Sequence, residues 1–409
     1  MTLSTEDRMA GNDDNLPKRL LLVDDDTSTA ALIEEGLQRQ HITLDKAASL
    51  DTALYYFNQT RYDVVLISLE FKPMQGLVLV QRWRAHEIPD RRCIGFIMVT
   101  GNKITDSNTG LIKELGDLEI LPKPFSVIQL LPVLQRAMMT RRRLLAFQDL
   151  KDKVLTYYAK TNDLGKSIEA VKKRLPELGN KGISVLYGLY EKAERYEDAL
   201  NLIGPLSDRE PNNATLLNAK ATMLMHLGRF DEAKPLLEKL DQMAPQNIAR
   251  IEQLTDAYLE LNQPDDGVNK MKEMMTLSPD QPDLKFEMFS KLYDHGYDSH
   301  AIALGKETTT PMEIVRFYNN KGVVLSKSNE IDKALTEYDH ALKFYPQFKK
   351  NYLIYFNVAL AHMHTKTIEG YEKAQKSLKQ CLQLEPTYDK ARQAMEQVEK
   401  VLQQHKKAS

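Results

Sequence analysis

The sequence predicts an α/β doubly wound domain followed by an all-α solenoid of helical repeats. In the first 140 residues, short apolar runs typical of buried strands alternate five times with segments of helical periodicity. Past residue 146 the strand signals vanish, and small residues recur every 34 positions, which indicates a repeat architecture. The expected organisation is a disordered tail over 1–17, a sheet domain over 18–140, a linker helix with a degenerate helical pair over 141–178, about six repeats over 179–388, and a capping helix and tail over 389–409.

Composition narrows the class of protein. A net charge of -2 gives no reason to expect a nucleic-acid partner. The two cysteines, Cys93 and Cys381, are far apart and lack partners at metal-ligand spacing, which fits a reducing compartment and predicts two buried thiols. No apolar run approaches the roughly 18 residues of a membrane span, and the polar start of the chain has no secretory signal. We therefore expect a cytoplasmic protein.

Five apolar runs, several of them rich in β-branched residues, predict strands that are buried on both faces, as in a parallel sheet. They cover residues 20–23, 42–48, 64–67, 93–99 and 118–121. Helical segments follow each run, beginning at Thr27 and then covering 51–57, 77–86 and 104–115. The last helix opens at Ser126, which together with Gln129 has the form of a capping box, and runs to about Leu150.

Polar side chains stand where these strands end. Because the carboxyl ends of parallel strands meet at one edge of the sheet, we expect those side chains to form a site. They are Asp24, Asp25, Ser68, Thr100 and Lys123. Carboxylates, a hydroxyl and an ammonium suit a hard cation and a phosphoryl group. Asp26 is expected to face solvent or to cap the following helix.

Residues 18–140 resemble the receiver domain of bacterial response regulators. The matching motifs are Asp24-Asp25 after the first strand, Met74 and Gly76 after the third, Thr100 after the fourth, and Lys123-Pro124-Phe125 after the fifth. The resemblance implies a flavodoxin-like fold in which the acidic pair helps to hold Mg²⁺. It also implies that an aspartate at position 68 accepts a phosphoryl group, which the threonine and the lysine contact.

The chain departs from that pattern at two positions. Ser68 replaces the phospho-accepting aspartate, and Ile120 stands where the family usually keeps an aromatic residue. A serine hydroxyl without an activating base is a far weaker nucleophile than a carboxylate, so we expect no phosphorylation cycle.

Several roles stay open for the remaining side chains of this edge. Asp24 and Asp25 either bind Mg²⁺ weakly or remain as a remnant or a helix cap, and no other cofactor is expected. Lys123 is expected to pair with one of them without phosphate. Glu70 could bring a carboxylate to the position that Ser68 leaves open.

The helical half resembles the tetratricopeptide repeat. Ala199, Ala233, Gly267 and Ala301 are each 34 residues apart, and Ala334 and Ala374 follow at 33 and 40, the last spacing implying an insertion around 365–367. Prolines twelve residues later end most second helices, but the copy around Ala301 lacks one in register, which predicts a short or irregular helix.

A stack of such pairs buries their apolar faces and exposes a groove. The resemblance places these residues in the groove: Asn218, Thr222, Arg316, Asn319, Val323 and Ser326. The simpler interpretation is that they are solvated helix faces. The same choice applies to Arg141-Arg142-Arg143, which is either a solvated linker face or a contact with acidic groups.

No phosphate-binding loop, nucleophile elbow or metal signature is present in the sequence, so we expect no enzymatic activity. The leading hypothesis is a phosphorylation-independent signalling adaptor that binds proteins or peptides through the groove and the receiver surface. The alternative is a receiver gated by Mg²⁺ or another ligand that controls the repeats, and a transcriptional regulator is a third. Homodimerisation stays open.

Overall fold

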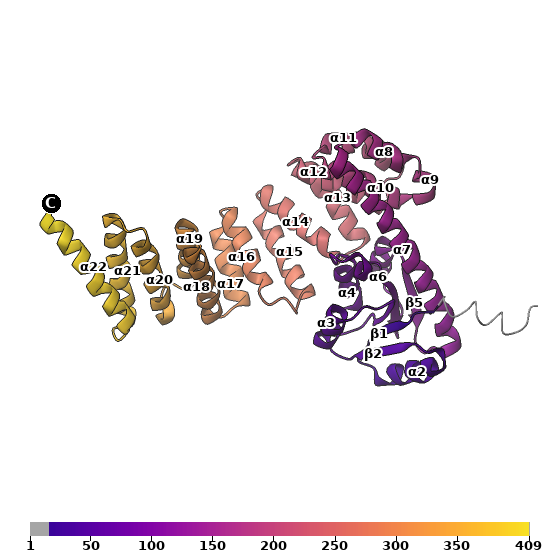
Figure 1. The fold of residues 1–409 in the computed structure, drawn as a ribbon, viewed down its shortest axis with the longest axis horizontal. Helices are drawn as coiled ribbons and strands as arrows, with labels where there is room; N and C mark the ends of the chain where they lie inside the picture. Colours follow the sequence, from indigo (N-terminus) through magenta and orange to yellow (C-terminus); the bar gives the residue numbers. More distant parts are fainter. Residues whose placement is uncertain (1–15, 409) are drawn as a thin grey trace, which may run out of the picture. The chain divides into compact units, whose positions relative to one another are not determined.

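The computed structural model describes residues 16–408, so most of the predicted tail at 1–17 lies outside the described residues. The chain divides into two compact units, Met1–Pro282 and Asp283–Ser409, and Figure 1 draws its helices and strands in sequence colours. No described helix combines the length and apolar character that a membrane crossing requires.

The first unit begins with a five-stranded parallel sheet in the order β2-β1-β3-β4-β5, which confirms the predicted doubly wound fold. Its strands are β1 (Arg19–Val23), β2 (Thr43–Ala47), β3 (Val64–Ser68), β4 (Gly95–Thr100) and β5 (Leu118–Pro122). Every residue of the central strands β3 and β4 is buried, as expected for strands covered on both faces.

Helices cover the two faces of the sheet. The helical elements are α2 (Thr27–Leu37), the 3₁₀ turn η2 (Gln38–Gln40), α3 (Leu50–Gln59), α4 (Gly76–Arg84), α5 (Pro89–Arg92), α6 (Asp106–Leu115) and α7 (Val127–Thr161). Alternate strand residues separate the core into two layers, so Leu21 and Val23 pack with α3, α4 and α6, whereas Leu20 and Leu22 pack with α2 and α7.

The aromatic centre of the first layer is Trp83 of α4. Its ring stacks on Phe57 of α3 at a centroid distance of 4.2 Å and lies 6.1 Å from the ring of Phe96 on β4. All three side chains are buried. This stack ties α3 and α4 to the sheet.

Helix α7 starts with the predicted capping box between Ser126 and Gln129 but extends to Thr161, beyond the predicted end near Leu150. Two residues of its arginine run contact acidic groups, and one of these two, Arg143, stays 63 % exposed. Arg141 is buried and pairs with Asp90 at 2.6 Å, and Arg143 pairs with Asp117. The longer helix therefore packs its basic residues against acidic groups of the sheet domain.

The rest of the first unit consists of helices that pack mainly against their neighbours in sequence. They are α8 (Leu164–Lys172), α9 (Leu175–Leu178), α10 (Asn180–Lys192), α11 (Tyr196–Arg209), α12 (Ala214–His226), α13 (Phe230–Met243), α14 (Ile248–Glu260) and α15 (Pro264–Leu277). The periodic small residues Ala199, Ala233 and Gly267 are buried in the second helix of each pair.

The second unit continues the helical pattern. Its elements are α16 (Leu284–Asp294), α17 (Asp298–Thr308), α18 (Pro311–Lys327), α19 (Ile331–Phe344), the 3₁₀ turn η3 (Lys349–Asn351), α20 (Tyr352–His364), α21 (Ile368–Leu384) and α22 (Asp389–Ala408). Helix α17, in the copy without an in-register proline, has 11 residues against 14 in α15, as predicted. Helix α21 begins directly after the predicted insertion at 365–367 and has 17 residues, against 14 in α19.

Helix α18 starts with a second capping box. The Thr310 backbone N–H donates to Glu313 Oε2 at 2.8 Å, and Lys285 of α16 lies 2.8 Å from Glu313 Oε1. The Lys285 contact and then the Thr310 hydrogen bonds lower the pKa of Glu313 from 4.5 to about 2. Since the folded pKa lies below the unfolded one, this stabilisation is present above pH 4.5 and is lost as the pH falls towards 2.

We expect the substitution Glu313→Gln to reduce the acid sensitivity of the second unit. Because the carboxylate is partly exposed, its loss should cost only about 0.5–1 kcal/mol at neutral pH, and the difference from wild type should shrink as the pH falls below about 4. Urea unfolding followed by circular dichroism at several pH values measures this. Glu396→Gln, on an exposed position of α22, is the control. Parallel pH profiles for Glu313→Gln and wild type would contradict the assignment.

Candidate functional site

The sheet places all five predicted site residues near the carboxyl ends of its strands. Asp24 and Asp25 follow β1, Ser68 ends β3, Thr100 ends β4 and Lys123 follows β5. Asp24, Ser68 and Thr100 are buried, whereas Asp25 is exposed.

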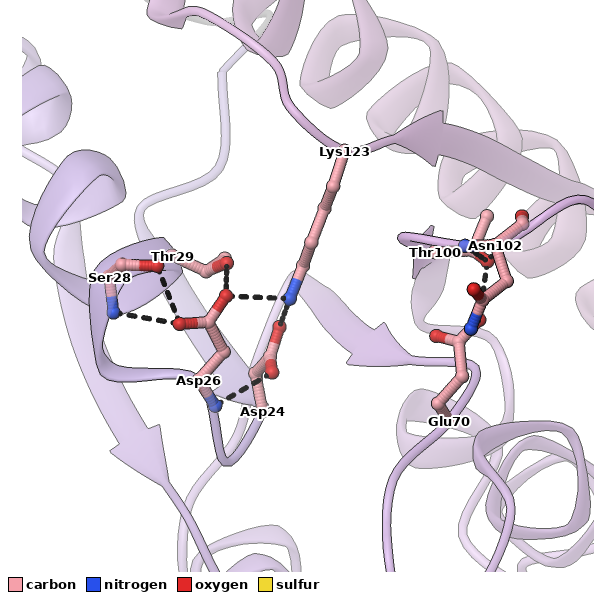
Figure 2. A network of polar contacts seen from close by, with 8 residues as sticks. All are labelled: Asp24, Asp26, Ser28, Thr29, Glu70, Thr100, Asn102 and Lys123. Carbon is pink, nitrogen blue, oxygen red and sulfur yellow. Dashed lines mark hydrogen bonds and ion pairs between the residues drawn. The ribbon is translucent and has the colours of Figure 1, made fainter.

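Lys123 is already paired with carboxylates in this structure. Its Nζ lies 2.8 Å from Asp24 Oδ2 and 3.2 Å from Asp26 Oδ2 (Figure 2). The Asp24 side chain is only 1 % exposed and that of Lys123 is 20 % exposed, so this is a largely desolvated contact. Burial alone would lower the pKa of Lys123, but the two carboxylates outweigh it and raise the pKa above its ordinary value.

Asp26 is the second anchor of Lys123, a contact that was not predicted from the sequence. Its carboxylate caps α2 by accepting from the Ser28 backbone N–H at 2.9 Å and from the hydroxyls of Ser28 and Thr29 at 2.6 and 2.7 Å. The Ser28 hydroxyl makes the largest contribution to holding the pKa of Asp26 well below its usual range. The expected capping role is therefore present, and the same carboxylate also faces the lysine.

The backbone of Ser68, the last residue of β3, lies very close to the backbone of Gly76. A Cβ atom at Gly76 would lie 2.3 Å from the Ser68 carbonyl oxygen, so the loop after β3 can return this closely only with glycine at position 76. The Ser68 side chain is buried and presents a hydroxyl at the end of β3.

Thr100 belongs to a separate hydrogen-bonded group at the end of β4. Its hydroxyl donates to Glu70 Oε1 at 2.7 Å, and the Asn102 backbone N–H donates to Thr100 Oγ1 at 3.2 Å. The Asn102 side-chain amide also donates to Glu70 at 3.3 Å. Figure 2 shows this group apart from the Lys123 pairs, so Glu70 engages Thr100 and Asn102 rather than the lysine.

This arrangement fits Mg²⁺ poorly. The buried carboxylate of Asp24 faces the ammonium of Lys123, and Ser68 supplies a hydroxyl where a further carboxylate would be needed. Within residues 16–408, no group of three or more His, Cys, Asp or Glu side chains is placed to hold a metal ion. The side chains at this edge therefore do not form a suitable donor set for Mg²⁺.

The predicted groove residues lie on the first helices of two repeats in different units. Asn218 and Thr222 are half-buried on α12, and the Thr222 hydroxyl accepts from Gln253 of α14 at 3.1 Å. On α18, Arg316 is exposed and Asn319 accepts from the Asn357 side chain of α20 at 2.6 Å. Val323 and Ser326 are half-buried on the same helix. Two of the six residues therefore connect neighbouring first helices.

The contacts that the sequence did not predict at this edge are those of Asp26 with Lys123 and of Glu70 and Asn102 with Thr100. A capping aspartate before a helix is a sequence signal for Asp26. The contacts of Glu70 and Asn102 depend on how two loops approach each other, and nothing in the local sequence reports that.

Comparison with protein families identifies both kinds of domain. The model described as the response regulator receiver domain matches residues 20–135. Two models described as the tetratricopeptide repeat match residues 190–258 and 315–348. The resemblances drawn from the sequence motifs are therefore confirmed.

Curated relatives and solved structures match parts of the chain. The regulatory protein VirG of Agrobacterium tumefaciens is 26% identical over 132 residues, which are 32% of this chain and 48% of VirG. The chain thus spans about half the length of the curated relatives it matches. The chemotaxis response regulator CheY4 of Vibrio cholerae is 26% identical, with a TM-score of 0.27, over 29% of this chain and 97% of CheY4.

A solved repeat protein matches a larger share of the chain. YrrB, described as a TPR protein with an unusual peptide-binding site, is 16% identical, with a TM-score of 0.27, over 56% of this chain and 99% of YrrB. The family matches alone show that the chain combines a response regulator receiver domain with tetratricopeptide repeats.

Proposed function

We propose that this protein is a non-catalytic signalling adaptor whose receiver domain works by surface contact, without accepting a phosphoryl group. Receiver domains joined to tetratricopeptide repeats support a signalling regulator with protein-interaction repeats, and both kinds of domain are generally non-catalytic. The observation that carries the finer proposal is Ser68, a buried hydroxyl at the end of β3 in place of a carboxylate.

The state of Lys123 supports the same proposal. In a phosphorylated receiver the lysine contacts the phosphoryl group, but here its charge is balanced by Asp24 and Asp26. An incoming phosphate would have to compete with a buried carboxylate 2.8 Å away. For this reason the ligand-gated alternative is the weaker one.

The repeats supply the second half of the proposal, which is the binding of a segment of another protein in the groove. Arg316, Asn319, Val323 and Ser326 lie on α18, and their mixture of charge, amide and apolar surface suits an extended or helical peptide. A cytoplasmic site of action belongs to the same proposal and is consistent with the free, buried Cys93 and Cys381.

We expect no phosphoryl adduct when the full chain is incubated with acetyl phosphate and Mg²⁺, because no carboxylate is available at position 68. Intact-mass measurement before and after the incubation tests this. The variant Ser68→Asp returns the carboxylate and serves as the matched comparison. A stoichiometric, base-labile adduct on the wild-type chain would refute the proposal.

We expect Lys123→Met to destabilise the sheet domain by about 3 kcal/mol, because it leaves the buried carboxylate of Asp24 without its counter-ion. The free energy of unfolding, followed by fluorescence in urea, measures this loss. Lys46→Met is the control, since Lys46 and its partner Glu34 are about half exposed and such pairs contribute less than about 1 kcal/mol. Equal effects of the two substitutions would show that the Lys123 pair is not a structural element.

A further inference from the structure

One side of the sheet domain is covered by the repeats of the first unit. On the sheet domain, the contacts come from α4 and α6. On the repeat side, they come from α13, the following loop 244–247, α14 and Asp280. We call the surface formed by Gln81, Arg82, Gly110 and Glu114 the docking face. None of these residues belongs to the strand-end site described above.

A buried arginine lies at the centre of this contact. The Arg250 side chain of α14 is completely buried, and its guanidinium donates to the carbonyls of Leu240 and Ala244 at 2.7 Å each. Both carbonyls lie at the C-terminal end of α13, and the Leu240 carbonyl also accepts from the Ala244 backbone N–H at 2.9 Å. The same guanidinium donates to Glu114 of α6, which is its carboxylate partner across the contact. A buried cation held in this way depends on that carboxylate.

Backbone approach next to this pair is unusually close. A Cβ atom at Gly110 of α6 would lie 1.9 Å from the carbonyl oxygen of Met243 and 3.2 Å from the Cα of Ala244. Only a residue without a side chain allows α6 to meet the end of α13 in this way. The face is therefore shaped for this segment of the chain.

Two α4 side chains extend the contact. Gln81 donates to the Gln246 carbonyl and accepts from the Ile248 backbone N–H, both at 2.9 Å, so its amide pairs with the backbone of the loop before α14. Arg82 donates to both carboxylate oxygens of Asp280 at 2.5 and 2.6 Å, and both side chains are mostly buried. Both hydrogen bonds come from Nη1 of Arg82, and they form a charge-assisted, mostly buried pair across the contact.

Apolar packing is continuous across the same boundary. Ala244 is buried within the core layer that contains Trp83 and Leu111, and Ile248 and Leu277 pack against that layer. The repeat side thus completes the hydrophobic core of the sheet domain. A core shared in this way makes two segments unfold together.

We infer that the docking face is an internal interaction surface whose partner is the chain's own α13–α15 segment, and that this contact makes the receiver domain and the first repeats one cooperative unit. An outside partner can use the face only by displacing the repeats. It would have to present a cation to Glu114 and a carboxylate to Arg82, as Arg250 and Asp280 do. This inference is independent of whether Ser68 can be phosphorylated.

Hydrogen exchange on the full chain tests the inference. In the variant Gly110→Ala, we expect amides of α6, of loop 244–247 and of α14 to exchange at least about tenfold faster, because the added methyl group separates the two surfaces. This loosening should occur although alanine favours a helix more than glycine does. Gly188→Ala is the matched control, since that helical glycine of α10 has no atom within 4 Å of the added Cβ. Wild-type exchange in Gly110→Ala would overturn the inference.

If Gly110→Ala also speeds exchange in β3 and β4, the substitution has disturbed the sheet domain as a whole. An exchange of the two charges of the Arg82–Asp280 pair then provides the test. Arg82→Asp and Asp280→Arg should each speed exchange in loop 244–247 and α14, and the double variant should restore protection towards the wild-type level. If the double variant exchanges as fast as the faster single variant, the two side chains do not meet in solution and the inference fails.

Discussion

The ion pair between Lys123 and Asp24 governs how the carboxyl edge of the sheet can behave. A buried carboxylate requires a counter-charge, and in this chain the lysine provides it at 2.8 Å while Asp26 holds the same ammonium from the other side. With the lysine paired and Ser68 offering only a hydroxyl, the charge of Lys123 is balanced without a phosphoryl group. The proposal that the domain works by surface contact, without accepting a phosphoryl group, follows from that balance.

The docking face, which joins the same domain to the first repeats, has the opposite arrangement of charges. At the strand-end site, Lys123 from a loop pairs with the buried Asp24 and the partly exposed Asp26. At the docking face, an acid of the sheet domain, Glu114, pairs with a buried cation of the repeats, Arg250. The first contact closes the domain on itself and the second joins it to the helices that follow. In the proposed role, a receiver domain with serine at position 68 serves as part of a larger surface.

Much of this organisation was predictable from local sequence. The parallel sheet with helices on both faces followed from five alternating apolar runs. The repeat helices followed from the 34-residue spacing of Ala199, Ala233 and Gly267, because periodic burial leaves a periodic signal. The pairing of Arg250 with Glu114 left no such signal, since the two residues are 136 positions apart and their meeting depends on how the domains dock. The sequence left two alternatives open for the arginine run for the same reason, because Asp90 and Asp117, the acids that pair with Arg141 and Arg143, are distant in sequence.

Trp83, in the aromatic stack of α4, is an intrinsic fluorescence probe. Trp83 is the only tryptophan of the chain, and it adjoins Arg82, the residue that binds Asp280. Its emission therefore comes from a single known environment between Phe57 and Phe96. Separation of the repeats from α4 would change the polarity around this one chromophore, so unlabelled wild-type protein can report on that movement in real time.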